Sequence, residues 1–266
     1  MNTKHELPNK SNNRNPQTLK PLRQAGQSDQ EMVRNLEFQI AAFIGAVIIF
    51  VLVIFNEWLT WLMHTPPQPI FWTVFLMIPI IYSIYKIRRL LAERRDWDWG
   101  RLGEIEVSDS LDELKKEGYD IFHDIQCEDK GRKFNIDHVI ISPHGIFAVE
   151  TKFPRKRILG NNRVIFDGLS IIRISGHKSD LETVPNAISK ASFLANKYLP
   201  KETSQKRYHV IPVLVYPSWS VIGNHLGRDA WVLNPGQLKA VISQQPLSLT
   251  QEQCNSVSKF LKERNR

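Results

Sequence analysis

Cysteine is scarce in this sequence of 266 residues, and so are the short motifs that mark several large enzyme classes. The two cysteines, Cys127 and Cys254, are too few and too far apart for a disulfide scaffold or a structural zinc site of about four clustered ligands. They indicate a reducing, cytoplasmic environment. The sequence also lacks GxxxxGK[ST], GxGxxG and GxSxG patterns, which argues against an ATPase, an oxidoreductase and a serine hydrolase.

Acidic residues are the minority among the charged side chains. Lys and Arg number 35 against 27 Asp and Glu, which gives a formal charge of +8 and a pI of about 9.5. Such an excess favours anionic partners, either lipid headgroups or nucleic acid, without choosing between them. A hydrophobic content of 42% excludes wholesale disorder, and the length allows one or two folded units at roughly 100 to 200 residues each.

Charged residues are absent from two apolar runs, residues 40–55 and 70–85. Neighbouring apolar residues extend the runs to about 40–60 and 68–87, close to the roughly 20 residues that cross a bilayer. The connector 56–69 has no Lys or Arg, whereas both outer flanks are basic. By the positive-inside rule this predicts a helical hairpin with both termini in the cytoplasm, anchored in the inner or cytoplasmic membrane. The alternative is a pair of buried helices in a soluble core.

The remainder of the chain divides into three parts by composition. Residues 1–37 form a polar arm that is predicted to be disordered, and the hairpin occupies residues 38–87. Residues 88–101 are basic and either lie against anionic headgroups of the lipid bilayer or continue the second helix in solvent. Residues 102–266 have the length of one folded domain.

Periodicity within residues 102–266 predicts alternating helices and strands. Apolar spacing indicates helices at 103–117, 185–198 and 250–262 and one that opens at Asn234-Pro235; β-branched and aromatic runs indicate strands at 121–125, 134–142, 146–153, 164–166, 171–174, 210–216 and 231–233. Pro143-His144-Gly145 reads as a hairpin turn. The nearly all-apolar run 210–216 is typical of a strand covered on both faces. This order predicts an α/β sandwich.

Three charged residues of the predicted hairpin form a candidate catalytic group. Asp137 lies on one strand, and Glu150 and Lys152 lie on the next, where alternation places them on one face. Cleavage of a phosphodiester builds negative charge, which calls for a divalent cation held by hard oxygen ligands and a nearby cationic side chain. We therefore expect Asp137 and Glu150 to hold Mg²⁺ and Lys152 to orient the attacking water or stabilise the developing charge.

Two alternatives remain open for this group. Glu150 and Lys152 can equally form a salt bridge at the edge of a solvated strand. In addition, Asp137 lies opposite Glu150 only if Ser142 pairs with Gly145 in the hairpin. A one-residue bulge at Gly145 would place the two carboxylates on opposite faces.

Several motifs taken in order resemble the nuclease-related domain called NERD, which is similar to the PD-(D/E)XK nuclease superfamily. The resemblance rests on Gly100-x-x-Gly103-Glu104, on Ile136-Asp137-His138-Val139, and on Gly145-Ile146-Phe147 leading to Val149-Glu150-Thr151-Lys152 and Gly160. It implies a restriction-endonuclease-like three-layer α/β sandwich with a mixed sheet. It also implies nucleic-acid processing and an acidic participant on the first helix, here Glu104, as an accessory metal ligand. Glu104 can alternatively be a charge that complements the N-terminus of its helix.

The sequence departs from the family pattern at two places. Members commonly carry a Pro-x-x-Gln turn that opens the helix after the sheet, whereas this chain has Pro185-Asn186-Ala187-Ile188 and lacks the glutamine. The loop after Lys152 is basic and, together with a later arginine, forms a candidate patch for nucleic-acid phosphates, with a solvated loop as the alternative. The residues of this patch are Arg155, Lys156, Arg157 and Arg163.

Two functions follow from these patterns. The first is a membrane-anchored nuclease that hydrolyses phosphodiester bonds of nucleic acid with Mg²⁺, through Glu104, Asp137, Glu150 and Lys152. The second is a catalytically inactive module of the same fold that binds nucleic acid or protein at the membrane. Neither hypothesis explains why such a domain should be tied to a bilayer.

Overall fold

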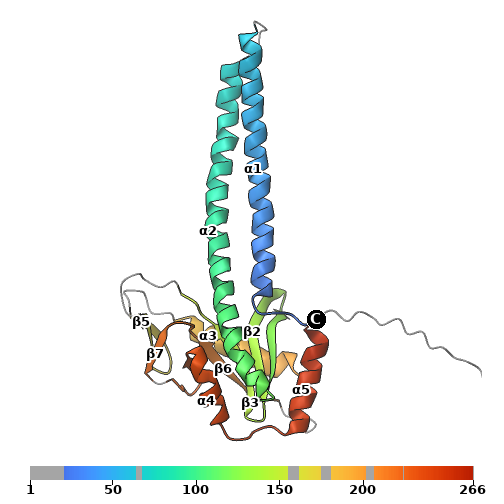
Figure 1. The fold of residues 1–266 in the computed structure, drawn as a ribbon, viewed down its shortest axis with the longest axis vertical. Coiled ribbons are helices and arrows are strands. Elements are labelled where there is room, and N and C mark those ends of the chain that lie inside the picture. The colour runs from blue at the N-terminus through green and yellow to red at the C-terminus, as the bar shows by residue number, and fades with distance from the viewer. Residues whose placement is uncertain are drawn as a thin grey trace, which may run out of the picture.

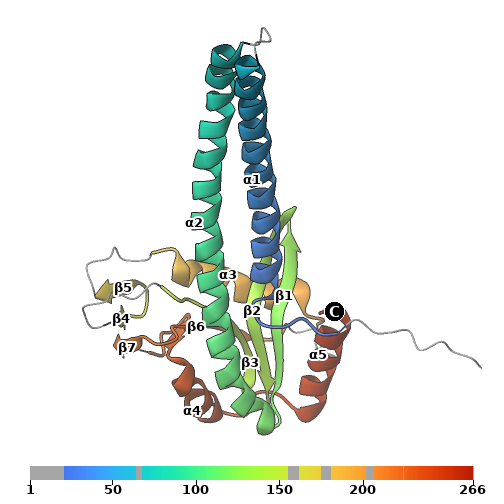
Figure 2. The ribbon, with the colours of Figure 1, turned by 45° about the horizontal axis from the view of Figure 1, so that its top comes forward.

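Two long helices rise from a mixed α/β domain (Figure 1). The computed structural model describes residues 21–63, 68–154, 162–174, 181–201, 207–223 and 225–265. Helices α1 (Gln27–Leu62) and α2 (Pro69–Lys116) run antiparallel and remain together along their length in both Figure 1 and Figure 2. Both are long and apolar enough to cross a membrane.

The outer part of the helical pair presents apolar side chains that the described chain does not cover. Met63, Ile70 and Ile78 are each at least 70% exposed. A water-soluble protein rarely exposes a continuous apolar surface of this extent, whereas hydrocarbon solvates it well. The exposed apolar surface of the two helices therefore fits contact with lipid better than burial in the core of a soluble protein.

Near the domain, α1 and α2 pack against each other through a small hydrophobic cluster. Leu36 and Leu90 are buried there, and Arg94 donates to Glu37 at 2.8 Å. Helix α1 begins at Gln27, so residues 27–37 are helical although the sequence placed them in a disordered arm. These residues are mostly polar, so the few apolar side chains that face α2 are not recognisable from composition. The packing of those side chains against α2 stabilises the additional helical turns. Residues 1–20 lie outside the described part of the chain.

Helix α2 joins three segments that the sequence analysis treated one by one, and it confirms the alternative in which residues 88–101 continue the second helix. Its 48 residues include the second apolar run, the basic segment 88–101 and the first helix of the domain, and they span about 72 Å at 1.5 Å per residue. Pro79 lies inside the helix, and Ser83 Oγ donates to its carbonyl oxygen at 2.7 Å. A single helix thus connects the apolar hairpin to the α/β domain.

The domain is built on a five-stranded mixed sheet with the order β1-β2-β3-β6-β8. The strands are β1 (Asp120–Asp129), β2 (Arg132–Ser142), β3 (Gly145–Thr151), β6 (Val210–Val215) and β8 (Trp231–Leu233). The first three are antiparallel, and β3, β6 and β8 are parallel. A smaller sheet contains β5 (Ile171–Ile174), β4 (Arg163–Phe166) and β7 (Ser220–Gly223). The sequence did not predict β7, which is short and largely exposed.

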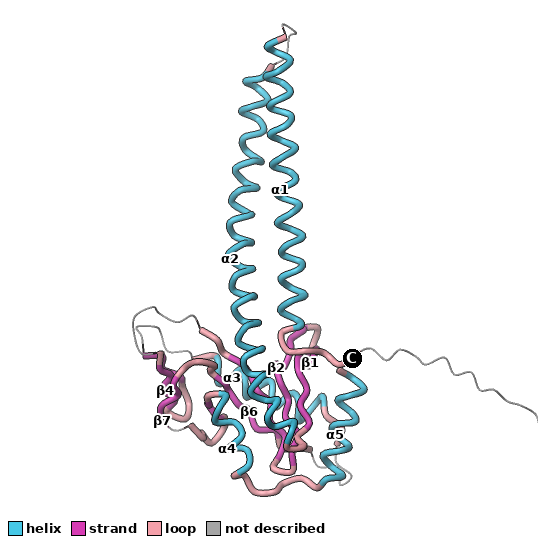
Figure 3. Tube along the Cα trace, viewed as in Figure 1, coloured by secondary structure: helices cyan, strands magenta, loops and turns pink. Residues whose placement is uncertain are grey.

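Helices cover both faces of the large sheet, as the cyan and magenta segments of Figure 3 show. On one face the end of α2 and α4 (Leu238–Ser243) form a core that includes Leu111, Phe147 and Leu238. On the other face α3 (Thr183–Phe193) and α5 (Gln251–Arg264) contribute Ala191 and Val257 to a second core. A π-helical turn (Leu194–Tyr198) follows α3, and a 3-10 turn (Pro235–Gln237) precedes α4. The predicted three-layer sandwich with a mixed sheet is confirmed.

Candidate functional site

The β2–β3 hairpin brings Asp137 and Glu150 to one pocket. Ser142 pairs with Gly145 and His138 pairs with Val149, so the register runs without a bulge and places Asp137 opposite Glu150. Both carboxylates are buried and line a pocket of about 370 Å³. The alternative register, with the two carboxylates on opposite faces, is therefore wrong.

Asp137 is held by the backbone of the neighbouring strand. The N–H of Thr151 donates to Asp137 Oδ2 at 2.7 Å. Burial, followed by the charge of Glu150, raises the pKa of Asp137 to about 7. A carboxyl group with this pKa changes its charge near neutral pH. A cation placed beside it would stabilise the ionised form.

Glu150 is paired with two lysines. Lys152 Nζ donates to Oε1 at 3.0 Å, and Lys190 Nζ from α3 donates to Oε2 at 2.5 Å. Burial on its own would raise the pKa of Glu150, but the charges of Lys152 and Lys190 and the hydrogen bonds they donate outweigh it, so the pKa is lowered. Glu150 is therefore ionised at neutral pH.

Lys190 did not stand out in the sequence. It lies two residues after Ile188, which occupies the position of the glutamine in the Pro-x-x-Gln family pattern. Helix α3 packs against β3 and β6, and this packing brings Lys190 to Glu150. A lysine on a helical stripe gives no signal of its own, because only the packing angle of the helix decides which strand it reaches.

Glu104 lines the same pocket from α2. It accepts a hydrogen bond from the N–H of Gly26 at 2.8 Å and is 7% exposed. Burial, followed by the charges of Asp137 and Asp29, raises the pKa of Glu104 to about 9, so the group is protonated at neutral pH. The alternative role at a helix N-terminus is wrong, because α2 begins 35 residues earlier at Pro69.

Asp29 is a fourth acidic residue in this pocket, and sequence reasoning missed it. It lies in the first turn of α1 and is 7% exposed. Burial, followed by the charge of Asp124, raises the pKa of Asp29 to about 6. Residues 1–37 were predicted to be a disordered arm, so no helix start was expected near Asp29. Nothing in the sequence placed it beside a strand more than a hundred residues away.

The pocket lies within a region that comparison with known families identifies. Residues 99–217 match the family model described as "Nuclease-related domain", NERD. The chain contains a nuclease-related domain. No curated protein and no solved structure matches the chain. The NERD match confirms the resemblance found in the sequence, and it includes every pocket residue discussed above except Asp29.

The donor set of the NERD domain fits a cation held by two carboxylates. Asp137 and Glu150 offer hard oxygen ligands on adjacent strands, and their mutual repulsion contributes to the raised pKa of Asp137. Within the described residues, no three His, Cys, Asp or Glu side chains are close enough to hold one ion together. Mg²⁺ commonly binds through one or two carboxylates plus water and substrate phosphate, so two ligands are sufficient. Glu104 as a third ligand stays a prediction.

Of the predicted nucleic-acid patch of the NERD domain, the structure describes Arg163. Arg155, Lys156 and Arg157 lie outside the described residues. Arg163 is exposed at the start of β4, where it pairs with Ile174 and Ser220 in the small sheet. It does not line the acidic pocket. The role of all four residues in binding nucleic acid stays a prediction.

Proposed function

We propose that the protein is a membrane-anchored nuclease whose NERD domain hydrolyses phosphodiester bonds of nucleic acid with Mg²⁺. The observation that carries this proposal is the convergence of Asp137, Glu150 and Lys152 on one pocket. The unbulged register of the hairpin produces that convergence, since every residue from Ser142 back to His138 finds its partner in sequence.

Each residue has a role that follows from its surroundings. Asp137 and Glu150 would hold Mg²⁺, which when bound supplies positive charge to the phosphate and lowers the pKa of a bound water. The Thr151 N–H fixes Asp137 for this task, and Lys152 offers its ammonium group to the charge that develops on the phosphate. Glu104 is protonated at neutral pH and adds no further negative charge until a cation binds.

The apolar hairpin would place this domain at the surface of a membrane. Helices α1 and α2 present apolar faces of sufficient length, and the basic flanks favour a cytoplasmic position for both termini. Basic residues of α2 just beyond the apolar run would contact anionic headgroups. They are Lys86, Arg88, Arg89, Arg94 and Arg95. Arg155, Lys156, Arg157 and Arg163 would contact the phosphates of the nucleic acid.

One observation favours a binding module that does not cleave. Both oxygens of Glu150 already accept hydrogen bonds from lysines. A carboxylate that is paired in this way is electrostatically satisfied without a metal ion, and Lys190 would have to give up Oε2 to a cation. Under this alternative the domain holds nucleic acid through its basic residues, and Mg²⁺ has no effect.

Cleavage assays on the full chain in lipid nanodiscs test the proposal. Labelled DNA and RNA are incubated with and without Mg²⁺, with wild type, Asp137→Asn and Lys152→Met. We expect each substitution to reduce metal-dependent cleavage about a hundredfold or more. Asp112→Asn and Lys239→Met change exposed charges elsewhere on the domain and serve as matched controls.

Two results would contradict hydrolysis. Cleavage that survives both substitutions would remove the assigned residues from the reaction. Wild-type protein that does not cleave but binds nucleic acid with strong salt dependence, unchanged by Asp137→Asn or Mg²⁺, would establish the binding module instead.

A further inference from the structure

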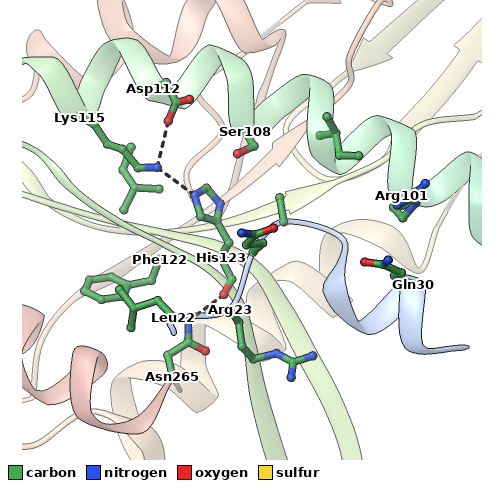
Figure 4. A pocket seen from close by; sticks show the side chains of 14 residues that line it. Leu22, Arg23, Gln30, Arg101, Ser108, Asp112, Lys115, Phe122, His123 and Asn265 are labelled. Atoms are coloured by element: carbon green, nitrogen blue, oxygen red, sulfur yellow. Dashed lines mark hydrogen bonds and ion pairs between the residues drawn. The ribbon is translucent and has the colours of Figure 1, made fainter. Parts of the chain in front are cut away.

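The chain that precedes α1 and the first turn of α1 lie against the nuclease-related domain. We call residues 21–29 the N-terminal strap. The N–H of Arg23 donates to the carbonyl oxygen of Asn265 at 3.2 Å, and Asn265 Nδ2 donates to the carbonyl oxygen of His123 at 2.8 Å. Leu22 and Phe122 line the same pocket as these residues, between the strap, α2 and β1 (Figure 4). The strap thus bridges β1 and the C-terminal end of the domain.

Asp124 of β1 is the centre of this attachment. Its side chain is fully buried and accepts hydrogen bonds from Arg23 Nε at 2.9 Å, Arg23 Nη2 at 2.8 Å, Ser28 N at 2.8 Å, Ser28 Oγ at 2.7 Å and Asn135 Nδ2 at 2.9 Å. All but one of these donors belong to the strap. A buried carboxylate that lost its cationic partner would be left with a large uncompensated desolvation cost.

The backbone at Asp124 is bent to make this contact. Its φ is +49°, a conformation that residues other than glycine rarely adopt. The β1–β2 ladder passes from the pair His123 and His138 directly to the pair Ile125 and Ile136, so Asp124 is out of regular pairing. Strain of this kind persists only where surrounding contacts outweigh it. Here the contacts that outweigh it come mainly from the strap.

The strap continues from Asp124 into the acidic pocket. Gly26 has a φ of +68° and donates its N–H to Glu104 Oε2 at 2.8 Å. A Cβ at Gly26 would lie 2.6 Å from Arg101 Cγ, so only glycine allows this close approach to α2. Three residues later Asp29 enters the pocket beside Gly100, where an added Cβ would lie 3.1 Å from Asp29 Oδ2.

We propose that the strap completes the candidate site, with the Gly26 N–H and Asp29 as positioning groups for Glu104 and for a cation held by Asp137 and Glu150. This inference rests on the proposed function and adds to it. It assigns a role to a segment outside the matched region 99–217. It also gives the tether a physical reason, because the helix that begins in the site is the helix that enters the membrane.

Hydrogen exchange on the full chain in nanodiscs tests the attachment. The strap amides, including Gly26 and Ser28, should exchange slowly in wild type. Asp124→Asn keeps the shape of the side chain and removes the charge that holds Arg23, and we expect strap exchange to accelerate about tenfold or more. Arg23→Ala should act in the same direction, with partial rescue by Arg23→Lys. Arg34→Ala, which alters an exposed arginine of the same helix, is the matched control and should leave strap exchange unchanged.

Binding of Mn²⁺, measured by calorimetry on the same preparations, tests the positioning role. Asp29→Asn leaves the contacts between the strap and Asp124 intact. It should weaken Mn²⁺ binding about fivefold to tenfold, because it removes a buried negative charge from the pocket. Asp124→Asn should weaken it similarly by releasing the strap. Arg34→Ala should leave the affinity unchanged.

The outcomes separate this inference from the proposed hydrolysis. Fast strap exchange in wild type, or wild-type Mn²⁺ affinity in both Asp29→Asn and Asp124→Asn, would overturn the inference even if the protein cleaves nucleic acid. If wild type binds no Mn²⁺ at all, metal-dependent hydrolysis fails and the cation role of the strap fails with it. Slow exchange that Asp124→Asn releases would then support the attachment to Glu104 alone.

Discussion

Lys190 of α3 reaches Oε2 of Glu150 at 2.5 Å, while Lys152, the nearer lysine in the chain, occupies Oε1 at 3.0 Å. One carboxylate therefore joins a strand to a helix forty residues away. The ammonium of Lys190 and a divalent cation would compete for the same oxygen. This competition distinguishes the two functions considered for the domain.

Replacement of Lys190 by methionine should separate its effects on stability and on cation binding. The substitution leaves buried Glu150 with one cationic partner, and we expect the free energy of unfolding to fall by about 1–3 kcal/mol. Mn²⁺ should bind more tightly, since Oε2 becomes available. Lys197→Met, which breaks the exposed ion pair with Asp129, should change each quantity little. Thermal unfolding and calorimetry of the full chain measure both. Unchanged Mn²⁺ affinity would show that the lysine and the cation do not share a site.

Acidification should destabilise the domain through His123. Burial, followed by the charge of Lys115, lowers the pKa of His123 from 6.5 to about 4. The unfolded chain therefore binds more protons between these values, and the stability contributed by neutral His123 is lost as pH falls from 6.5 toward 4. Each pH unit in this window costs at most about 1.4 kcal/mol.

The pH dependence of thermal unfolding checks this expectation. His123→Gln should lose less stability than wild type between pH 6.5 and 4. The difference between the two profiles reports on His123 together with His138, because Nδ1 of buried His138 lies 2.8 Å from Nδ1 of His123. The exposed His209, changed to glutamine, should give the wild-type profile. Parallel profiles for wild type and His123→Gln would contradict the assignment.

Gly103 should tolerate no side chain. A Cβ at this position would overlap Cβ of Phe153, whose ring stacks on Trp99 at a centroid distance of 5.0 Å. Gly103→Ala should push Phe153 away from α2 and displace the adjacent Lys152, with a loss of about 1–3 kcal/mol in the free energy of unfolding. Gly45→Ala has open space around the new Cβ and should be neutral or slightly stabilising. Thermal unfolding of the two variants compares them directly, and a stabilised Gly103→Ala would contradict the contact.

Topology reporters should place the C-terminus of the chain in the cytoplasm. The basic flanks of the hairpin predict this orientation, so a C-terminal fluorescent protein should be bright and a C-terminal alkaline phosphatase should be inactive in bacterial cells. A phosphatase fused in the connector after residue 63 should be active. The reverse pattern would exclude contact of the domain with cytoplasmic nucleic acid.

Much of the domain could be predicted because its elements carry local signals. The turn Pro143-His144-Gly145 and the alternating pattern around it determine the hairpin, and a buried strand such as β6 is recognisable from its composition alone. Asp137, Glu150 and Lys152 could be found for the same reason, since strand alternation relates residues that are close in sequence.

Other features had no local signal. Strand β7 is short and mostly exposed, and the change in composition at the basic segment left open whether the helix continues there, as α2 does. Both depend on neighbours that sequence patterns do not reveal. Short strands form where a partner edge is available, and a polar helix persists where an adjacent helix covers one of its sides.

By itself the sequence determined the apolar hairpin, the order of the α/β elements other than β7, and the three charged residues at the β2–β3 hairpin, because hydrophobic periodicity and alternation act over a few residues. Only the tertiary structure decided that Lys190 neutralises Glu150 and that Asp29 and Gly26 join Glu104. Those contacts depend on where rigid helices cross the sheet. Burial at such a crossing, and not spacing along the chain, sets the charge that each carboxyl group carries.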